Sequence, residues 1–297
     1  MPTPVGGQGH CGISKEASFA AGGTIEKWFP ITSESLNPTF ANVYTDQVRN
    51  SAEQVGGQAG NESVAGDIVF PVTPKMPAEI FICGLGSGDS LTEFHVERPL
   101  DSLMIEIDHE TAAVQASGAM IESLVFSSTQ GGELSCTASI QAEGMNNRTA
   151  GTPVYSGDNN PYLHSDAAFR LNNTADTSIT TWSLTIANTL ITDLYGTTKR
   201  RIDIPAGKLV VTGTFTKLFD DTTERAAFLA QSERSFQVKF SRGTNYLTFL
   251  CPEIRYETHT ENIGGQSEYI LETYGFTSYV DTPATRSNSL RVSGDFS

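Results

Sequence analysis

Residues 64–70 read Val-Ala-Gly-Asp-Ile-Val-Phe, and residues 211–215 read Val-Thr-Gly-Thr-Phe. Both stretches predict a β-strand, because large apolar side chains recur at alternate positions around a glycine. The surrounding features recur in the same order. A strand start (Ser-Leu at 35 and again at 183) and a polar stretch come before each quoted strand; a short helix, two strands, a Gly-Gly turn and a last strand follow it.

The spacing of these landmarks indicates an internal duplication. The offset between the two copies is 148 residues at the Ser-Leu start (183 − 35), 147 at the glycine (213 − 66) and 133 at the Gly-Gly turn (264 − 131). The alternative is two unrelated sets of short strands, because strands and turns at this spacing are common in all-β proteins.

Alternation extends through most of the chain, whereas helical patterns are rare. Residues 103–108 and 236–240 place apolar side chains on one face and polar ones on the other. Two segments predict helices, residues 221–231, where Asp221 and Glu224 form a capping-box pattern, and residues 74–83, which Pro77 shortens. The sequence therefore predicts an all-β fold with one or two short helices.

We predict four segments from these patterns. They are an N-terminal arm (1–20), a first β unit (21–150), a second β unit (151–283) and a polar C-terminal tail (284–297), in which Leu290 and Val292 alternate like a short strand.

The charge of the chain limits its partners. Lys and Arg number 19 against 34 Asp and Glu, which gives a net charge of −15. Cationic side chains bind phosphate groups by displacing their counterions, and this chain has no excess of such side chains. We therefore do not expect tight binding to nucleic acid or to an anionic membrane. A net negative charge would, however, suit a channel through which DNA passes without binding. The N-terminus has no signal-peptide pattern, and no run of 18 apolar residues occurs, so we expect synthesis in a reducing cytoplasm and no membrane partner.

No motif predicts catalysis, a cofactor or a metal. Cys11, Cys83, Cys136 and Cys251 lie far apart without a CxxC pair and read as reduced apolar residues. Residues 7–12 match GxGxxG, but neither a preceding strand nor a following helix is expected there. Residues 108–110, Asp-His-Glu, read as a strand end that enters a turn.

The ordered set of short signatures resembles the tail tube (major tail) proteins of long-tailed bacteriophages, the siphophages. The resemblance covers roughly residues 16–283 and is carried by several short stretches: Glu16–Gly23, Phe29–Leu36, Ala65–Ile68 with Ile82–Gly86, Val211–Phe215, and Leu250–Ile254. It implies a β-sandwich or barrel-like subunit whose inner strands join those of neighbouring subunits in a ring. Such rings stack into a tube around a tape-measure protein, between tail-tip and terminator proteins, and DNA later passes through the lumen without specific binding. The resemblance therefore implies a virion protein with no catalytic role.

Within this resemblance, the residues suggest particular surfaces. Strand alternation makes Glu106, Asp108, Glu253, Arg255 and Glu257 candidates for lining the lumen, and ordinary outer-surface positions are the alternative for each. Lys199, Arg200 and Arg201 form a basic cluster that we interpret as an inter-subunit contact with an acidic neighbour, or else as a solvated loop. If each β unit is one tube-like unit, three chains would form a pseudo-six-fold ring; a six-fold ring with an added outer domain is the alternative.

Two other classes share this composition. One is a different self-assembling phage β protein, such as a capsid decoration or tail terminator subunit. The other is a carbohydrate-binding β-sandwich, which would need exposed aromatic side chains on one face. Trp28 and Trp182 both read as packing residues instead.

Overall fold

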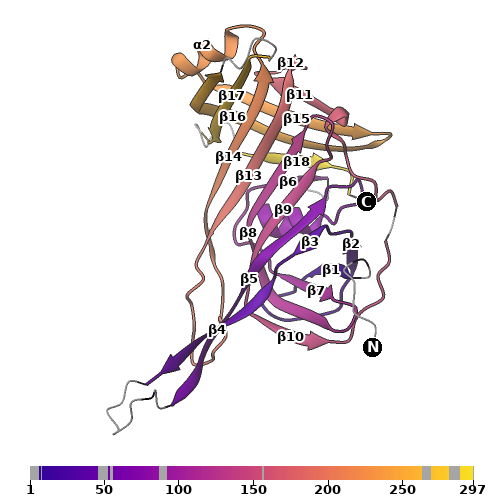
Figure 1. Ribbon diagram of the computed structural model, residues 1–297, viewed down its shortest axis with the longest axis vertical. Coiled ribbons are helices and arrows are strands. Elements are labelled where there is room, and N and C mark those ends of the chain that lie inside the picture. Colours follow the sequence, from indigo (N-terminus) through magenta and orange to yellow (C-terminus); the bar gives the residue numbers. More distant parts are fainter. Residues whose placement is uncertain are drawn as a thin grey trace.

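The computed structural model describes residues 7, 9–45, 53, 56–86, 92–155, 157–262, 269–280 and 288–296. In these ranges the molecule is elongated, with long β-strands running along most of its length (Figure 1). The all-β prediction is confirmed, because strands dominate the described ranges and only two short α-helices occur in them. Neither α-helix in the described ranges is long and apolar enough to cross a membrane.

The described residues of the first half form ten strands and one α-helix. They are β1 (His10–Lys15), β2 (Lys27–Phe29), β3 (Ser33–Glu34), β4 (Asn37–Tyr44), β5 (Gly57–Pro71), α1 (Glu79–Leu85), β6 (Glu93–His95), β7 (Leu103–Asp108), β8 (Ala113–Thr129), β9 (Ser135–Ala142) and β10 (Gly144–Arg148).

In the second half, the part that the structure describes forms eight strands, the 3-10 turn η2 and one α-helix. They are η2 (His164–Asp166), β11 (Ala167–Leu171), β12 (Thr174–Asp176), β13 (Ile179–Leu190), β14 (Ala206–Leu218), α2 (Thr223–Leu229), β15 (Arg234–Arg242), β16 (Asn245–Asn262), β17 (Leu271–Ser278) and β18 (Arg291–Gly294).

The same strand pairings occur in both halves. In the first, β1 pairs with β2 and β7, β5 with β4 and β9, and β8 with β7, β9 and β10. In the second, β11 pairs with β12 and β15, β14 with β13 and β17, and β16 with β15, β17 and β18. α1 follows β5 and α2 follows β14, which occupy equivalent places in the two sets of pairings. We call residues 10–148 the first unit and residues 167–294 the second unit.

The two glycines quoted first occupy matching places in this topology. Gly66 lies opposite Ile140 in the β5–β9 pair, and Gly213 lies opposite Phe276 in the β14–β17 pair. A Cβ atom at Gly213 would come within 2.3 Å of the Phe276 ring, and one at Gly66 within 2.4 Å of the Ser35 carbonyl oxygen. A side chain at Gly66 would clash with backbone, and one at Gly213 would require the buried Phe276 ring to move, so both places favour glycine.

Both ends of the chain contribute a strand to the units. β1 lies within the segment that composition assigns to an arm, yet five of its six residues are buried between β2 and β7. β18 lies within the predicted tail and pairs with β16 and β6. Small and polar residues conceal β1 in the sequence, whereas the alternation of Leu290 and Val292 indicates the strand in which β18 lies.

Both helices are shorter than their sequence patterns predict. α2 begins at Thr223, and Asp221 accepts a hydrogen bond from the Thr223 N–H (2.7 Å) just before it instead of forming a capping box. α1 begins at Glu79, after Pro77, and ends at Leu85, just before Gly86, whose φ of 120° suits glycine.

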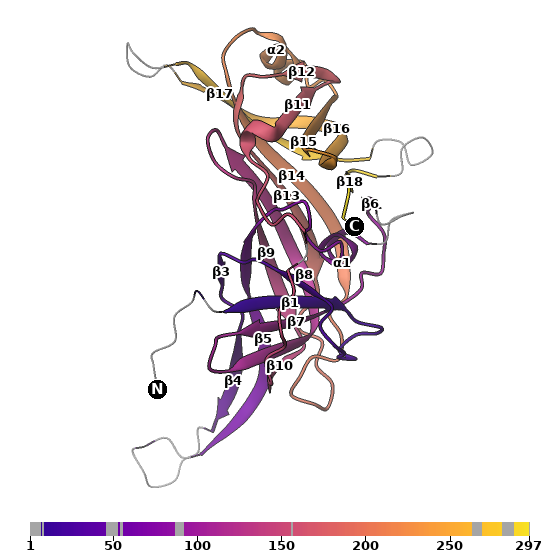
Figure 2. The ribbon, with the colours of Figure 1, turned by 90° about the vertical axis from the view of Figure 1, so that its right-hand side faces the viewer.

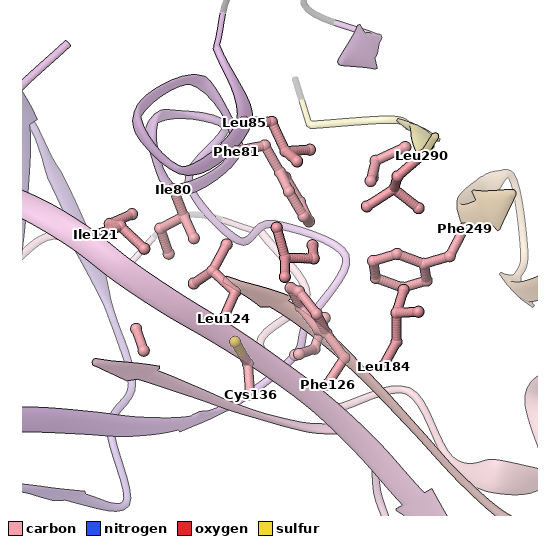
Figure 3. Close-up of a cluster of buried hydrophobic side chains, with 14 of the residues drawn as sticks. Ile80, Phe81, Leu85, Ile121, Leu124, Phe126, Cys136, Leu184, Phe249 and Leu290 are labelled. Carbon is pink, nitrogen blue, oxygen red and sulfur yellow. The ribbon is translucent and has the colours of Figure 1, made fainter. Parts of the chain in front are cut away.

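One continuous cluster of buried side chains runs through both units. Figure 3 shows Ile80, Phe81 and Leu85 of α1 facing Leu124 and Phe126 of β8 in the first unit. The same cluster includes Leu184, Phe249 and Leu290 of the second unit. The two units therefore fold against a shared core, while β1 and β7 run across the long strands of the first unit (Figure 2).

Candidate assembly surfaces

The two units are joined edge to edge by a β8–β13 pairing. Seven residue pairs make this junction, from Thr181 opposite Thr129 to Ala187 opposite Ser123. Trp182, Leu184 and Ile186 of β13 point into the core, and the Trp182 indole N–H donates to the Ser128 hydroxyl (2.7 Å). Sheet pairing and core packing thus hold the units together.

The counterparts of both junction strands lack a second strand partner in the described ranges. β3 and β4 are equivalent to β13, and they pair only with β5. Every residue of β4 is exposed, including Phe40, Val43 and Tyr44. Beyond Arg255, the strand β16, equivalent to β8, pairs only with β17. We call these two stretches the β4 edge (residues 37–44) and the β16 edge (residues 256–262).

The two edges lie at opposite ends of the molecule. The β4–β5 hairpin projects at one end of the long axis, and β16 and β17 lie at the other, beside α2 (Figure 1). A second copy placed end to end would therefore bring the β4 edge of one chain to the β16 edge of the next.

The strands between the edges form one long sheet with a hydroxyl-rich side. The order is β4-β5-β9-β8-β13-β14-β17-β16. On the side opposite the core, hydroxyls hydrogen-bond across neighbouring strands: Thr39 with Ser63 (2.7 Å), Ser127 with Ser135 (3.3 Å), Ser183 with Thr214 (2.8 Å) and Thr216 with Thr273 (2.9 Å). We call these eight side chains the hydroxyl face.

Few charged groups accompany the hydroxyl face. Asp67 accepts a hydrogen bond from Ser139 (2.6 Å), and Glu122 accepts one from Gln141 (3.0 Å). The alternating Ser and Thr positions of these strands were the available sequence signal, but composition alone did not assign them to one side of a sheet.

The five acidic and basic lumen candidates are placed differently from one another. Glu106 has no exposed surface; its carboxylate lies 2.7 Å from Arg148 Nε and accepts the Gly151 N–H (2.6 Å). Asp108 lies 3.4 Å from His10 Nδ1. Both residues are on β7, outside the long sheet. Glu253 is buried on β16.

Arg255 and Glu257 are exposed on β16. Arg255 lies opposite Thr277, its guanidinium stacks over the Tyr279 ring (5.4 Å to the centroid), and it is 3.7 Å from Glu233. Of the five candidates, Arg255 and Glu257 are the two with exposed side chains, and a lumen-lining role for any of the five stays a prediction.

The basic cluster connects the two units within the chain. Arg200 Nε donates to Glu62 (2.8 Å) and its Nη2 to Asn146 (3.0 Å), both in the first unit. Arg201 is buried; its Nε donates to the Thr192 carbonyl (2.8 Å) and its Nη1 to the Ala142 carbonyl (3.0 Å). Lys199 is exposed. The acidic neighbour of Arg200 is thus Glu62 of the same chain, and contact with another subunit stays a prediction.

Replacing Arg201 with Met is expected to reduce the free energy of unfolding by about 2 kcal/mol, because buried carbonyl groups lose a charged donor. Urea denaturation followed by circular dichroism measures this change. Lys199→Ala, one residue away and exposed, serves as the control and should stay within about 0.5 kcal/mol of the parent. Equal midpoints for the two variants would show that Arg201 does not hold this segment.

Burial controls the chemistry of the four cysteines. All are free and buried, and burial raises the pKa of each thiol, that of Cys251 to about 12. Thiolates at these positions are therefore scarce near neutral pH, which makes the thiols unreactive.

Two opposing effects determine the pKa of Lys217. Burial of the Lys217 ammonium group lowers its pKa, whereas hydrogen bonds to Asp220 and Asp176 raise it. The hydrogen bonds outweigh burial, so the pKa of Lys217 is raised. The ion pair with Asp176 ties β14 to the end of β12, and the pair with Asp220 is local to the end of β14.

The fold is that of an all-β protein with two equivalent units, and the β8–β13 pairing joins their sheets into one. Comparison with known families gives a match to the model described as phage tail tube protein over residues 6–278. The match spans most of the chain, so this chain belongs to the phage tail tube protein family, and the predicted resemblance is confirmed. It is accordingly a structural component of the virion tail. Comparison with curated proteins gave no match.

Proposed function

We propose that this chain is the major subunit of a phage tail tube and that three copies close into a ring through their β4 and β16 edges. The observation that carries the proposal is the β8–β13 junction, which joins two equivalent units within one chain. Its counterpart strands, β4 and β16, have unpaired edges in the described ranges. A head-to-tail contact of this kind generates a ring when its rotation closes.

Ring closure would also remove exposed sheet edges. Unpaired edges invite uncontrolled association, and joining them into a closed sheet abolishes them. Each chain contributes eight strands to the long sheet, so three chains would contribute 24. Closed sheets of about 16–18 strands already enclose an aqueous channel, and the diameter grows with strand number. A ring of 24 strands would therefore enclose a wider lumen.

The hydroxyl face suits the inner wall of such a ring. Serine and threonine hydroxyls remain hydrated and carry no charge, so they offer phosphates no cation with which to exchange counterions. The net charge of −15 further disfavours adhesion of DNA. In this arrangement Arg255 and Glu257 lie near the junction between chains, and the genome passes without specific binding or catalysis. Stacked rings would surround a tape-measure protein between terminator and tip proteins in the virion, after synthesis in the host cytoplasm.

The internal junction predicts which residues meet between chains. Ser123 and Thr258 both follow a register shift in the pairing with the next strand, so they are equivalent. Thr39 lies opposite Ser63, three residues before Gly66. Ala187 lies opposite Val210, three residues before Gly213, so Thr39 and Ala187 are equivalent. Because Ala187 lies opposite Ser123, Thr39 of one chain should lie opposite Thr258 of the next.

A disulfide test measures this register and the ring size together. Thr39→Cys with Thr258→Cys places both thiols at exposed positions, and directly opposed residues on paired strands are close enough for a disulfide. Tubes assembled under reducing conditions and then oxidised should give a covalent three-chain species as the largest band without reductant. Electron microscopy of end-on views should show three-fold symmetry.

The matched control is Thr39→Cys with Thr260→Cys, whose side chains would be diagonal neighbours about 7–8 Å apart. It should form little cross-link. Equal cross-linking of both pairs, or none in either, would contradict the proposed edge pairing. A largest species of six chains would reject the three-fold ring while retaining the edge contact.

A further inference from the structure

Three potential metal ligands meet on the side of β16 and β17 that faces α2. A donor atom from each of His259, Glu261 and Glu272 lies within 4.8 Å of the other two. Glu261 and Glu272 are directly opposite each other in the strand pairing, and His259 is two residues before Glu261 on the same strand. The three side chains therefore share one face of the sheet.

Two atoms of this cluster are buried without a partner in the described ranges. Glu272 is 1% exposed; its Oε2 accepts the Tyr274 hydroxyl (2.8 Å), but its Oε1 accepts nothing. His259 Nε2 is also buried and unbonded. Buried polar atoms normally have partners, and an unpaired one is costly.

The surroundings offset little of the charge on the two carboxylates. Like charges directly opposite each other destabilise a strand pair. Arg225 of α2 is 3.6 Å from Glu261 but about half exposed, and no ion pair to Glu272 occurs within the described residues. The His259 ring is held between Tyr274 (4.7 Å between centroids) and Phe228 (5.5 Å), which orients its nitrogens.

The first unit fills the same three places with apolar side chains. Ser123 of β8 is equivalent to Thr258 of β16, so Leu124 corresponds to His259 and Phe126 to Glu261. Cys136 lies opposite Phe126 and therefore corresponds to Glu272. These three residues are fully buried beneath α1 (Figure 3). The topology therefore does not require polar groups there, and their presence in the second unit calls for a separate explanation.

We propose that His259, Glu261 and Glu272 bind one divalent transition-metal cation, with Zn²⁺ the best fit. Imidazole nitrogen together with carboxylate oxygen is a common Zn²⁺ ligand set, whereas Mg²⁺ and Ca²⁺ prefer oxygen ligands alone. Bonds of about 2.0–2.2 Å require the donor atoms to approach one another by roughly 1 Å. Glu261, which is only partly buried, can supply much of this movement. The bound ion would tie β16 to β17 next to the β16 edge.

Zinc binding to the full-length chain tests the site. After dialysis against ZnCl₂, elemental analysis should find one zinc per chain in the parent and in the control Glu257→Gln, whose side chain is exposed on the same strand. Glu272→Gln and His259→Leu should each bind zinc at least about tenfold more weakly. Zn²⁺ should also raise the melting temperature of the parent by several degrees, but not that of these two variants.

The variants are chosen to keep the fold. Glu272→Gln removes one of two opposed charges without changing shape, and His259→Leu introduces the residue found at the equivalent position of the first unit. Circular dichroism confirms folding of each variant. No zinc in the parent, or equal zinc in the parent, Glu272→Gln and His259→Leu, would overturn the proposal.

Discussion

Replacing Phe81 with alanine is expected to lower the free energy of unfolding by about 3–5 kcal/mol, the largest effect of any single change considered for this chain. Phe81 has no exposed surface and contacts four aromatic rings, Phe94, Phe126, Phe249 and Phe296, at centroid distances of 5.3–6.3 Å. Because Phe249 and Phe296 belong to the C-terminal half, the cavity would loosen the contact between the units as well as the packing of α1.

Thermal and urea denaturation measure this loss. For a chain of this size each kcal/mol corresponds to roughly 2–4 °C, so a decrease in melting temperature of about 10 °C is expected. Phe40→Ala is the matched control, since Phe40 on β4 is 56% exposed and should change stability by less than about 0.5 kcal/mol. Similar stabilities for the two variants would show that the core around Phe81 is not shared as described.

Replacing Glu16 with alanine is expected to lower the free energy of unfolding by about 3 kcal/mol. The Glu16 carboxylate is buried and accepts hydrogen bonds from the N–H groups of Ala20 (3.2 Å), Gly22 (3.0 Å) and Gly118 (3.0 Å) and from the Ser102 hydroxyl (2.6 Å). Removing the carboxylate leaves several buried donors unpaired. It also releases the segment after β1, which the composition had assigned to an arm.

Glu26→Ala provides the comparison, because Glu26 is exposed and should tolerate the change. Urea denaturation of both variants distinguishes a structural carboxylate from a surface one. An unchanged midpoint for Glu16→Ala would mean that water satisfies these donors as well as Glu16 does.

Sequence reasoning was most successful where a pattern is local. Alternation at residues 103–108 predicted β7, and the alternation at residues 236–240 predicted the centre of β15. Ordered landmarks, including Gly66 and Gly213, were enough to suggest the duplication whose strand pairings recur in the two halves. The Gly-Gly turn at residues 264 and 265 lies outside the described residues.

The places of individual side chains do not follow from local patterns, because they depend on which face each strand buries. Glu106 alternates with apolar neighbours as a surface residue would, yet side chains on both faces of β7 are buried, and Glu106 is paired with Arg148. Likewise, Lys199–Arg201 reads as a surface patch, but the fold of the β13–β14 connection buries Arg201 against carbonyl groups. Such placements are tertiary and leave no local signal.

The in-chain β8–β13 junction also changes how a ring would assemble. Six separate units need five association steps to close a ring, whereas three chains that each hold two units need only two. Each association of free molecules loses translational and rotational freedom worth an estimated 4–15 kcal/mol at a 1 M standard state. Duplication within one chain would thus shift part of this entropic cost from assembly to folding, and the proposed ring would form at lower subunit concentration.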